Sequence, residues 1–176
     1  MVSSYTPTLA ALLQARRNIT PIRRKGATAL LVAEPYANGL EQFPIETVVE
    51  EVNAVVPILT DASVSPIIVG DLDLNMRGPG ALVKVVIDSV PEVAILHLAC
   101  HGLQDLEDPL ESGFCLRDGK LTVAELMKLN LPHAFLAFLS ACETAKGDHA
   151  HQPDQAVHLA AAMLFTGFRS VIATMW

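Results

Sequence analysis

Two residues of this sequence have the chemistry and the placement of a nucleophile and its base. His101 and Cys142 each follow directly on a short apolar run, and about forty residues separate them. If the two runs form adjacent parallel strands, both side chains emerge at the carboxyl edge of one sheet, where open α/β sheets bind their ligands. A cysteine beside a histidine can transfer acyl groups, because the imidazole helps to form the thiolate and later protonates the leaving amine. The spacing therefore predicts a cysteine–histidine dyad.

Gly102 follows the candidate base and adds a second part of the same chemistry. A glycine lets the backbone turn and lets a substrate carbonyl come close. The backbone N–H of Gly102, together with that of Cys142, could donate to the oxyanion that forms when a thiolate attacks a carbonyl. We therefore expect the oxyanion hole at Gly102 and Cys142.

The segments that must position these residues alternate between short apolar runs and amphipathic stretches, a pattern typical of a parallel sheet with crossover helices. His101 follows the third expected strand and Cys142 follows the fourth. We expect five strands, at residues 27–33, 66–70, 93–99, 134–141 and 170–175. We expect helices at residues 9–16, 45–59, 82–90, 123–129 and 154–165.

The helix at residues 45–59 has the clearest periodicity, with Pro44 in its first turn. The carboxylates Glu46, Glu50 and Glu51 are assigned to the face opposite the apolar one.

Turn and cap signals stand between the third and fourth expected strands. A hairpin is expected over residues 114–121, with its turn at Asp118-Gly119, and its charges Arg117, Asp118 and Lys120 are assigned to the surface. Thr122 then begins a short helix with a capping box that Glu125 completes.

Together these elements predict one α/β domain, a three-layer α/β/α sandwich with a mainly parallel sheet. Residues 1–26 are interpreted as an N-terminal arm and residues 27–176 as the folded domain, long enough to bury a core without disulfides or a structural metal. The sequence stops at Trp176 inside an apolar run. We therefore expect a domain truncated at its C-terminal end.

Composition narrows the class of partner. Hydrophobic residues make up 51% of the chain and charged residues 18%, which is typical of a folded globular domain. The formal net charge of −7 and the confinement of the basic cluster to the arm argue against nucleic acid. No apolar run reaches the length of a membrane span. Three cysteines without a CxxC motif or an export signal favour a reducing, cytoplasmic location.

Three segments resemble a known family. They are LHLACHG at residues 96–102, LSACETAKGD at residues 139–148 and AAAMLFTGFRSVIATMW at residues 160–176. They closely resemble CHAT domains, which are caspase-like domains named for their association with tetratricopeptide repeats and are similar to separases. Residues 2–16 also resemble the family's lead-in to its first core strand, so the resemblance covers essentially the whole chain.

The resemblance implies a caspase-like fold and a cysteine endopeptidase that needs no cofactor. The family's histidine falls on His101, its nucleophile on Cys142, and its oxyanion amides on Gly102 and Cys142. The expected partners are a protein or peptide substrate, cleaved through a thioacyl intermediate, and repeat or signalling modules in cis. CHAT domains normally continue past the Met-Trp with a helix and a last strand, so the resemblance implies a domain truncated before its last helix and strand. The alternative is a catalytically silent signalling or interaction module of the family, gated by partner domains.

Two acidic residues after the nucleophile are candidates for specificity. Glu143 and Asp148 could line a pocket that selects Arg or Lys before the scissile bond. The alternative is that backbone hydrogen bonds hold Glu143 and that Asp148 belongs to a Gly-Asp turn.

The remaining candidates have structural interpretations. Cys100 is expected to pack away from the face of His101, Cys115 to be structural, and His97 to be a hydrogen-bonded core histidine or to orient the site from behind. No metal is expected, because no second ligand set completes a tetrahedral site with the histidines and aspartates of one polar stretch, His149, His151, His158, Asp148 and Asp154. The phosphate-binding glycine motifs are absent after the first expected strand.

Overall fold

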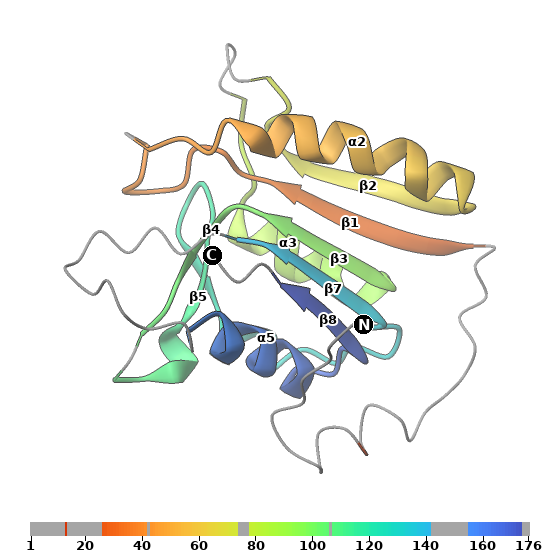
Figure 1. The fold of residues 1–176 in the computed structure, drawn as a ribbon. Helices are drawn as coiled ribbons and strands as arrows, with labels where there is room; N and C mark the ends of the chain where they lie inside the picture. The colour runs from red at the N-terminus through yellow and green to blue at the C-terminus, as the bar shows by residue number, and fades with distance from the viewer. Residues whose placement is uncertain are drawn as a thin grey trace, which may run out of the picture.

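A computed structural model describes residues 13, 26–41, 43–73, 78–105, 107–141 and 155–173. Within these residues the chain forms two sheets (Figure 1). The larger sheet is parallel throughout, with the strand order β2-β1-β3-β7-β8. The smaller sheet is antiparallel, with the order β4-β5-β6. The predicted α/β sandwich with a mainly parallel sheet is therefore confirmed.

The strands of the larger sheet arise from the apolar runs of the sequence. Residues of β1 alternate between two core clusters, one on each face of the sheet, so a continuous apolar run is buried on both sides. All five expected strands form, with ends that differ by a few residues. Their bounds are β1 Ala27–Ala33, β2 Val64–Gly70, β3 Ile95–Ala99, β7 Leu136–Ser140 and β8 Ser170–Ala173.

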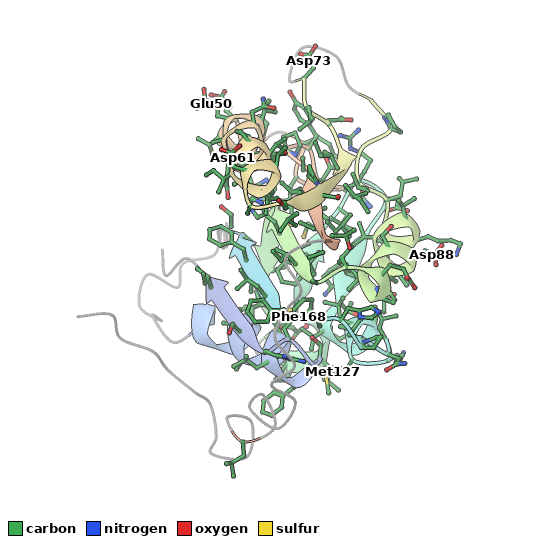
Figure 2. All side chains as sticks on the ribbon, turned by 90° about the vertical axis from the view of Figure 1, so that its right-hand side faces the viewer. Glu50, Asp61, Asp73, Asp88, Met127 and Phe168 are labelled. Carbon is green, nitrogen blue, oxygen red and sulfur yellow. The ribbon has the colours of Figure 1, made fainter. Side chains whose placement is uncertain are left out.

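Helices cover both faces of the larger sheet (Figure 1). Val48 and Val52 of α2 (Thr47–Asp61) pack in the core cluster on one face. The cluster on the other face includes residues of α3 (Val83–Ser89), α4 (Val123–Leu126) and α5 (Gln155–Phe165). A 3-10 turn, η1 (Val90–Glu92), follows α3. Exposed carboxylates such as Glu50, Asp61 and Asp88 lie on the outer sides of these helices, whereas Phe168 is buried in the interior (Figure 2).

Helix α2 corrects two details of the prediction. It begins at Thr47, so Pro44 precedes the helix, and it continues through Pro57 to Asp61. Glu51 does not lie on the outer face, because its carboxylate contacts side chains of the sheet. Glu51 stands three residues after the buried Val48, a spacing that places it on the same face of a helix.

The smaller sheet contains the expected hairpin and one unexpected strand. β5 (Gly113–Cys115) and β6 (Lys120–Thr122) pair antiparallel across the Asp118-Gly119 turn, as predicted. The capping box of Thr122 and Glu125 is also confirmed, although α4 ends at Leu126. The additional strand β4 (His101–Leu103) pairs with β5, and the 3-10 turn η2 (Pro109–Glu111) lies between them. No helix in the described part of the chain has both the length and the apolar character to cross a membrane.

Candidate active site

The candidate base lies where the larger sheet passes into the smaller one. β3 ends at Ala99 and β4 begins at His101. β3 and β7 are adjacent and parallel, with Ala99 opposite Ser140. The two strands therefore have the adjacent, parallel arrangement on which the dyad prediction depends. Cys142 itself, two residues beyond the end of β7, lies outside the described residues.

Gly102 brings the two chain segments together. A Cβ atom at Gly102 would lie 3.3 Å from Cβ of Ala141 and 3.5 Å from Cδ1 of Leu159. The first separation is tighter than ordinary van der Waals contact, so any larger residue would push against the end of β7. Ala141 immediately precedes Cys142 in the chain. The segment of the candidate base is thus packed against the residue before the candidate nucleophile.

A backbone carbonyl fixes the imidazole of His101. Its Nε2 lies 2.8 Å from the carbonyl oxygen of Phe43, which belongs to the lead-in to α2, residues 43–46. A carbonyl oxygen can only accept, so Nε2 carries the hydrogen. In the neutral ring Nδ1 is then the nitrogen that can take up a proton. The ring is buried, with 1% of its surface exposed.

The surroundings of His101 suit a base that is neutral before reaction. Burial lowers the pKa of His101 below its usual value, because a charged imidazolium loses hydration inside the protein. The hydrogen bond to the Phe43 carbonyl opposes this effect but does not outweigh it. At neutral pH the imidazole is therefore uncharged and able to accept a proton.

A second histidine lies behind the first. Nε2 of His97 is 2.8 Å from Oε1 of Glu51, and Oγ of Ser140 is 2.7 Å from Oε2 of the same carboxylate. His97 is 3% exposed and meets the ring of Phe138 edge-on, with centroids 5.0 Å apart. The expected hydrogen-bonded core histidine is confirmed. We did not predict that Glu51 would be its partner. The sequence alone could have suggested a buried contact for Glu51, because this carboxylate stands among the apolar core positions of a helix.

The two hydrogen bonds determine the charge of Glu51. Burial by itself would raise the pKa of this carboxyl, but the hydrogen bonds from His97 and Ser140 outweigh burial and lower it. Glu51 is therefore an anion at neutral pH. We call Glu51, His97 and Ser140 the α2 cluster.

Arg117 was also misassigned from the sequence. Its guanidinium donates from Nη2 to Oε1 of Glu34 at 2.9 Å and to Oδ2 of Asp71 at 2.6 Å, and Nε donates to the carbonyl of Tyr36. Glu34 and Asp71 are buried at the ends of β1 and β2. Hairpin charges are ordinarily solvated, but here the turn folds back onto the sheet. The three residues are too far apart in sequence for spacing to reveal the contact.

Glycine allows the chain to close around this ion cluster. Gly80 has a φ of +70°, and a Cβ there would lie 2.6 Å from Oε2 of Glu34 and 2.7 Å from Cζ of Arg117. The next residue, Ala81, donates its N–H to Oε2 of Glu34 at 2.7 Å. The cluster therefore fixes residues 78–81 and the β5–β6 turn against the carboxyl edge of the sheet.

The two described cysteines are unsuited to nucleophilic attack. Cys100 is fully buried in the core cluster on the face opposite α2, as expected, and Cys115 is 4% exposed. Burial is the main cause that raises the pKa of both thiols, so the reactive thiolate is disfavoured at each. Cys142 is the remaining cysteine of the sequence.

Several expected site residues fall outside the described part of the chain. Glu143 and Asp148, the candidates for specificity, are among them, as are His149 and His151 of the polar stretch considered for a metal. Among the residues that the structure describes, no group of three or more His, Cys, Asp or Glu is placed to hold a metal ion.

Comparison with known proteins assigns the family. The family model of the CHAT domain matches residues 1–176, the whole chain, so the chain belongs to the CHAT domain family. This family is related to caspase-like peptidases. The search of curated proteins finds no match.

Proposed function

We propose that this CHAT domain is a cysteine endopeptidase with His101 and Cys142 as its catalytic dyad. His101 takes the thiol proton, and the Cys142 sulfur forms a bond to the carbon of a substrate carbonyl. The C–N bond then breaks, His101 protonates the departing amine, and a thioacyl intermediate remains. Water, activated by the same imidazole, hydrolyses this intermediate and restores the thiol. The amides of Gly102 and Cys142 hold the oxyanion in both steps.

The observation that carries the proposal is the contact between Gly102 and Ala141. This contact brings the segment that carries the base next to the segment that carries the nucleophile. A Cβ at Gly102 would lie only 3.3 Å from Cβ of Ala141. The hydrogen bond from His101 to the Phe43 carbonyl supports the proposal further, because it selects the tautomer whose Nδ1 can act as a base. The raised pKa of the Cys100 and Cys115 thiols leaves Cys142 as the cysteine that can supply the thiolate.

The proposal extends to the cellular location, the substrate and the partners of the enzyme. A thiol nucleophile and two further unpaired cysteines favour the reducing cytoplasm. The proposed chemistry calls for no cofactor. The substrate is a protein or peptide, and Asp148 and Glu143 would favour a basic residue before the scissile bond. Repeat or signalling modules in cis are the partners we propose.

Cleavage of an unbiased peptide library tests the proposal. The chain is compared with Cys142→Ala, with His101→Gln, and with Cys115→Ala as a control that removes a thiol outside the dyad. We expect cleavage by the chain and by the Cys115 control, and none by the two dyad variants. Folded protein that cleaves nothing, or cleavage that survives Cys142→Ala, would contradict the proposal. The first result would favour a silent signalling or interaction module gated by partner domains.

The same library tests the specificity residues. If Asp148 lines the pocket, the preferred peptides carry Arg or Lys before the cleaved bond, and Asp148→Asn weakens that preference. Cleavage with no basic preference, or with a preference that Asp148→Asn leaves unchanged, would remove Asp148 from the site.

A further inference from the structure

We propose that Glu51 is a positioning residue that holds the strand of the base and the strand of the nucleophile in register with each other and with α2. The inference rests on the proposed function, because it concerns the same dyad. Glu51 touches neither dyad residue in the contacts described. It acts through the two strands and through the lead-in to α2.

One carboxylate connects both strands. Oε1 of Glu51 accepts from His97 on β3, and Oε2 accepts from Ser140 on β7. His97 precedes His101 by four residues, and Ser140 precedes Cys142 by two. A shift of either strand relative to the other would break one of these hydrogen bonds, so Glu51 opposes relative movement of the two strand ends.

The segment that leads into the same helix carries the group that holds the base. The Phe43 carbonyl that accepts from His101 stands at the start of the lead-in to α2, and Ile45 anchors that lead-in through a hydrogen bond from its N–H to the carbonyl of Pro35. The buried contacts of α2 with the sheet are otherwise aliphatic, from Val48 and Val52. Aliphatic contacts tolerate sliding, whereas hydrogen bonds fix both distance and direction. Glu51 therefore sets the position along the sheet at which α2 presents the Phe43 carbonyl.

The composition of the α2 cluster argues against a purely stabilising role. Nδ1 of His97 is buried and has no hydrogen-bond partner among the residues that the structure describes. An unsatisfied buried polar atom is costly, and buried polar groups can often be replaced by apolar ones without loss of stability. The presence of such a cluster on the two strands that lead to the dyad fits a function in positioning.

Three substitutions on α2 separate positioning from stability. Glu51→Ala removes both hydrogen bonds, whereas Glu51→Gln can keep them, because its amide oxygen accepts from His97 and its amide nitrogen donates to the Ser140 oxygen. Glu50→Ala alters the adjacent, exposed carboxylate. Each is assayed with a peptide that the unchanged chain cleaves, and its midpoint of thermal unfolding is recorded.

We expect Glu51→Ala to lower kcat about tenfold or more, because small displacements of reacting groups slow a reaction strongly. KM should change less than about twofold, because the proposal gives Glu51 no contact with the substrate. Glu51→Gln should stay within about threefold of the unchanged kcat, and Glu50→Ala should have no effect. A loss of equal size in Glu51→Gln and Glu51→Ala would overturn positioning in favour of a charge effect. A wild-type kcat in Glu51→Ala would overturn the proposal altogether.

Two further variants control for destabilisation. Val56→Ala weakens the packing of α2 but leaves the α2 cluster intact. An apolar combination, Glu51→Leu with His97→Phe and Ser140→Ala, removes the cluster while keeping the interface packed. We expect Val56→Ala to retain kcat, and the apolar combination to unfold no earlier than the unchanged chain but to be about tenfold slower. Full activity of the apolar combination would contradict the proposal, as would an equal loss of kcat in Val56→Ala.

A spectroscopic measurement distinguishes failure of this inference from failure of the proposed function. The Nε2–H proton of His101 reports the hydrogen bond to Phe43 and can be observed by ¹H–¹⁵N NMR of the imidazole whether or not any peptide is cleaved. We expect this resonance to shift and its solvent exchange to accelerate in Glu51→Ala, and to be unchanged in Glu51→Gln and Glu50→Ala. An unchanged resonance in Glu51→Ala would overturn the positioning role even if the chain proves to be a peptidase.

Discussion

The imidazole of His101 gets its orientation, its tautomer and its charge state from its immediate surroundings. The Phe43 carbonyl sets the orientation and places the hydrogen on Nε2. Burial keeps the ring uncharged by lowering its pKa. A base needs all three properties before it can accept a proton from a thiol in a defined direction.

Gly102 gives the most specific prediction at this scale. Gly102→Ala would place a methyl group 3.3 Å from Cβ of Ala141, so the two strand ends would have to move apart by a few tenths of an ångström. We expect peptide cleavage to slow about tenfold or more, and the free energy of unfolding to fall by about 1 kcal/mol or more. Enzyme kinetics and urea denaturation measure the two effects.

Gly119→Ala is the matched control for Gly102→Ala. Among the residues that the structure describes, a Cβ at Gly119 meets only Cγ2 of Val83, at 3.9 Å, which is an ordinary contact. We expect normal activity and stability for this control. Equal cleavage rates and equal free energies of unfolding in the two variants would show that the Gly102 contact affects neither activity nor stability.

The lowered pKa of His101 also predicts a pH dependence of stability. As the pH falls below about 6.5, the unfolded chain binds a proton at this position before the folded chain does. The stability from the neutral, buried ring is complete above that pH and is lost as the pH falls through the lower folded pKa. We expect unfolding free energies, measured by urea denaturation across this range, to fall less steeply in His101→Gln. Parallel curves for the two proteins would contradict the assigned direction.

At the scale of elements, the ion cluster of Glu34, Asp71 and Arg117 ties the smaller sheet to the larger one. It joins the ends of β1 and β2 to the turn between β5 and β6. β5 in turn pairs with β4, the strand that begins with His101. The candidate base is thus supported from one side by the lead-in to α2 and from the other by a hairpin that Arg117 holds in place.

Removal of Arg117 tests this link. Arg117→Met would leave the buried carboxylates of Glu34 and Asp71 without their cation, and we expect a loss of about 3 kcal/mol or more in the free energy of unfolding. Arg117→Lys should recover only part of the loss, because a single ammonium cannot reproduce the forked hydrogen bonds of a guanidinium.

Lys84→Met is the control for the Arg117 variants. Lys84 forms an exposed pair with Asp88 on α3, and its loss should cost less than about 1 kcal/mol. Urea denaturation of Arg117→Met, Arg117→Lys and Lys84→Met measures the three losses in the free energy of unfolding. Similar small losses for Arg117→Met and Lys84→Met would show that the ion cluster does not hold the hairpin.

The elements themselves were largely predictable from local patterns. Apolar runs gave the strands of the larger sheet, Asp118-Gly119 gave the hairpin, and Thr122 with Glu125 gave the cap of α4. The short strand β4 was missed, because three residues carry no periodicity and the strand exists only by pairing with β5.

The polar contacts behind the site were much less predictable. Glu34, Asp71 and Arg117 meet from three distant parts of the chain, so no spacing rule relates them. Glu51 is different, because its spacing of three residues from Val48 could have assigned it to the buried face of α2, although we predicted the opposite face. The dyad prediction itself drew on two strand ends, and the structure describes one of its two residues.

At the scale of the whole molecule, polar groups with defined partners gather at the carboxyl edge of the parallel sheet. Glu34 follows β1, Asp71 follows β2, His101 follows β3 and Ser140 ends β7. The core clusters on both faces of the sheet consist of hydrophobic residues. This division is what a parallel α/β sheet requires of a site, since ligands bind outside the carboxyl ends of the strands.

The pH dependence of Cys142 alkylation tests the central claim most directly. Iodoacetamide reacts with the thiolate, so its rate against pH reports the ionisation of the thiol, with labelling at Cys142 read by mass spectrometry. If His101 is its partner, alkylation should already accelerate as the neutral imidazole forms, below a pH of about 6.5, because that ring takes up the thiol proton, and His101→Gln should leave only the rise near pH 8.5 of a free thiol. Identical profiles near pH 8.5 in the unchanged chain and in His101→Gln would contradict the dyad.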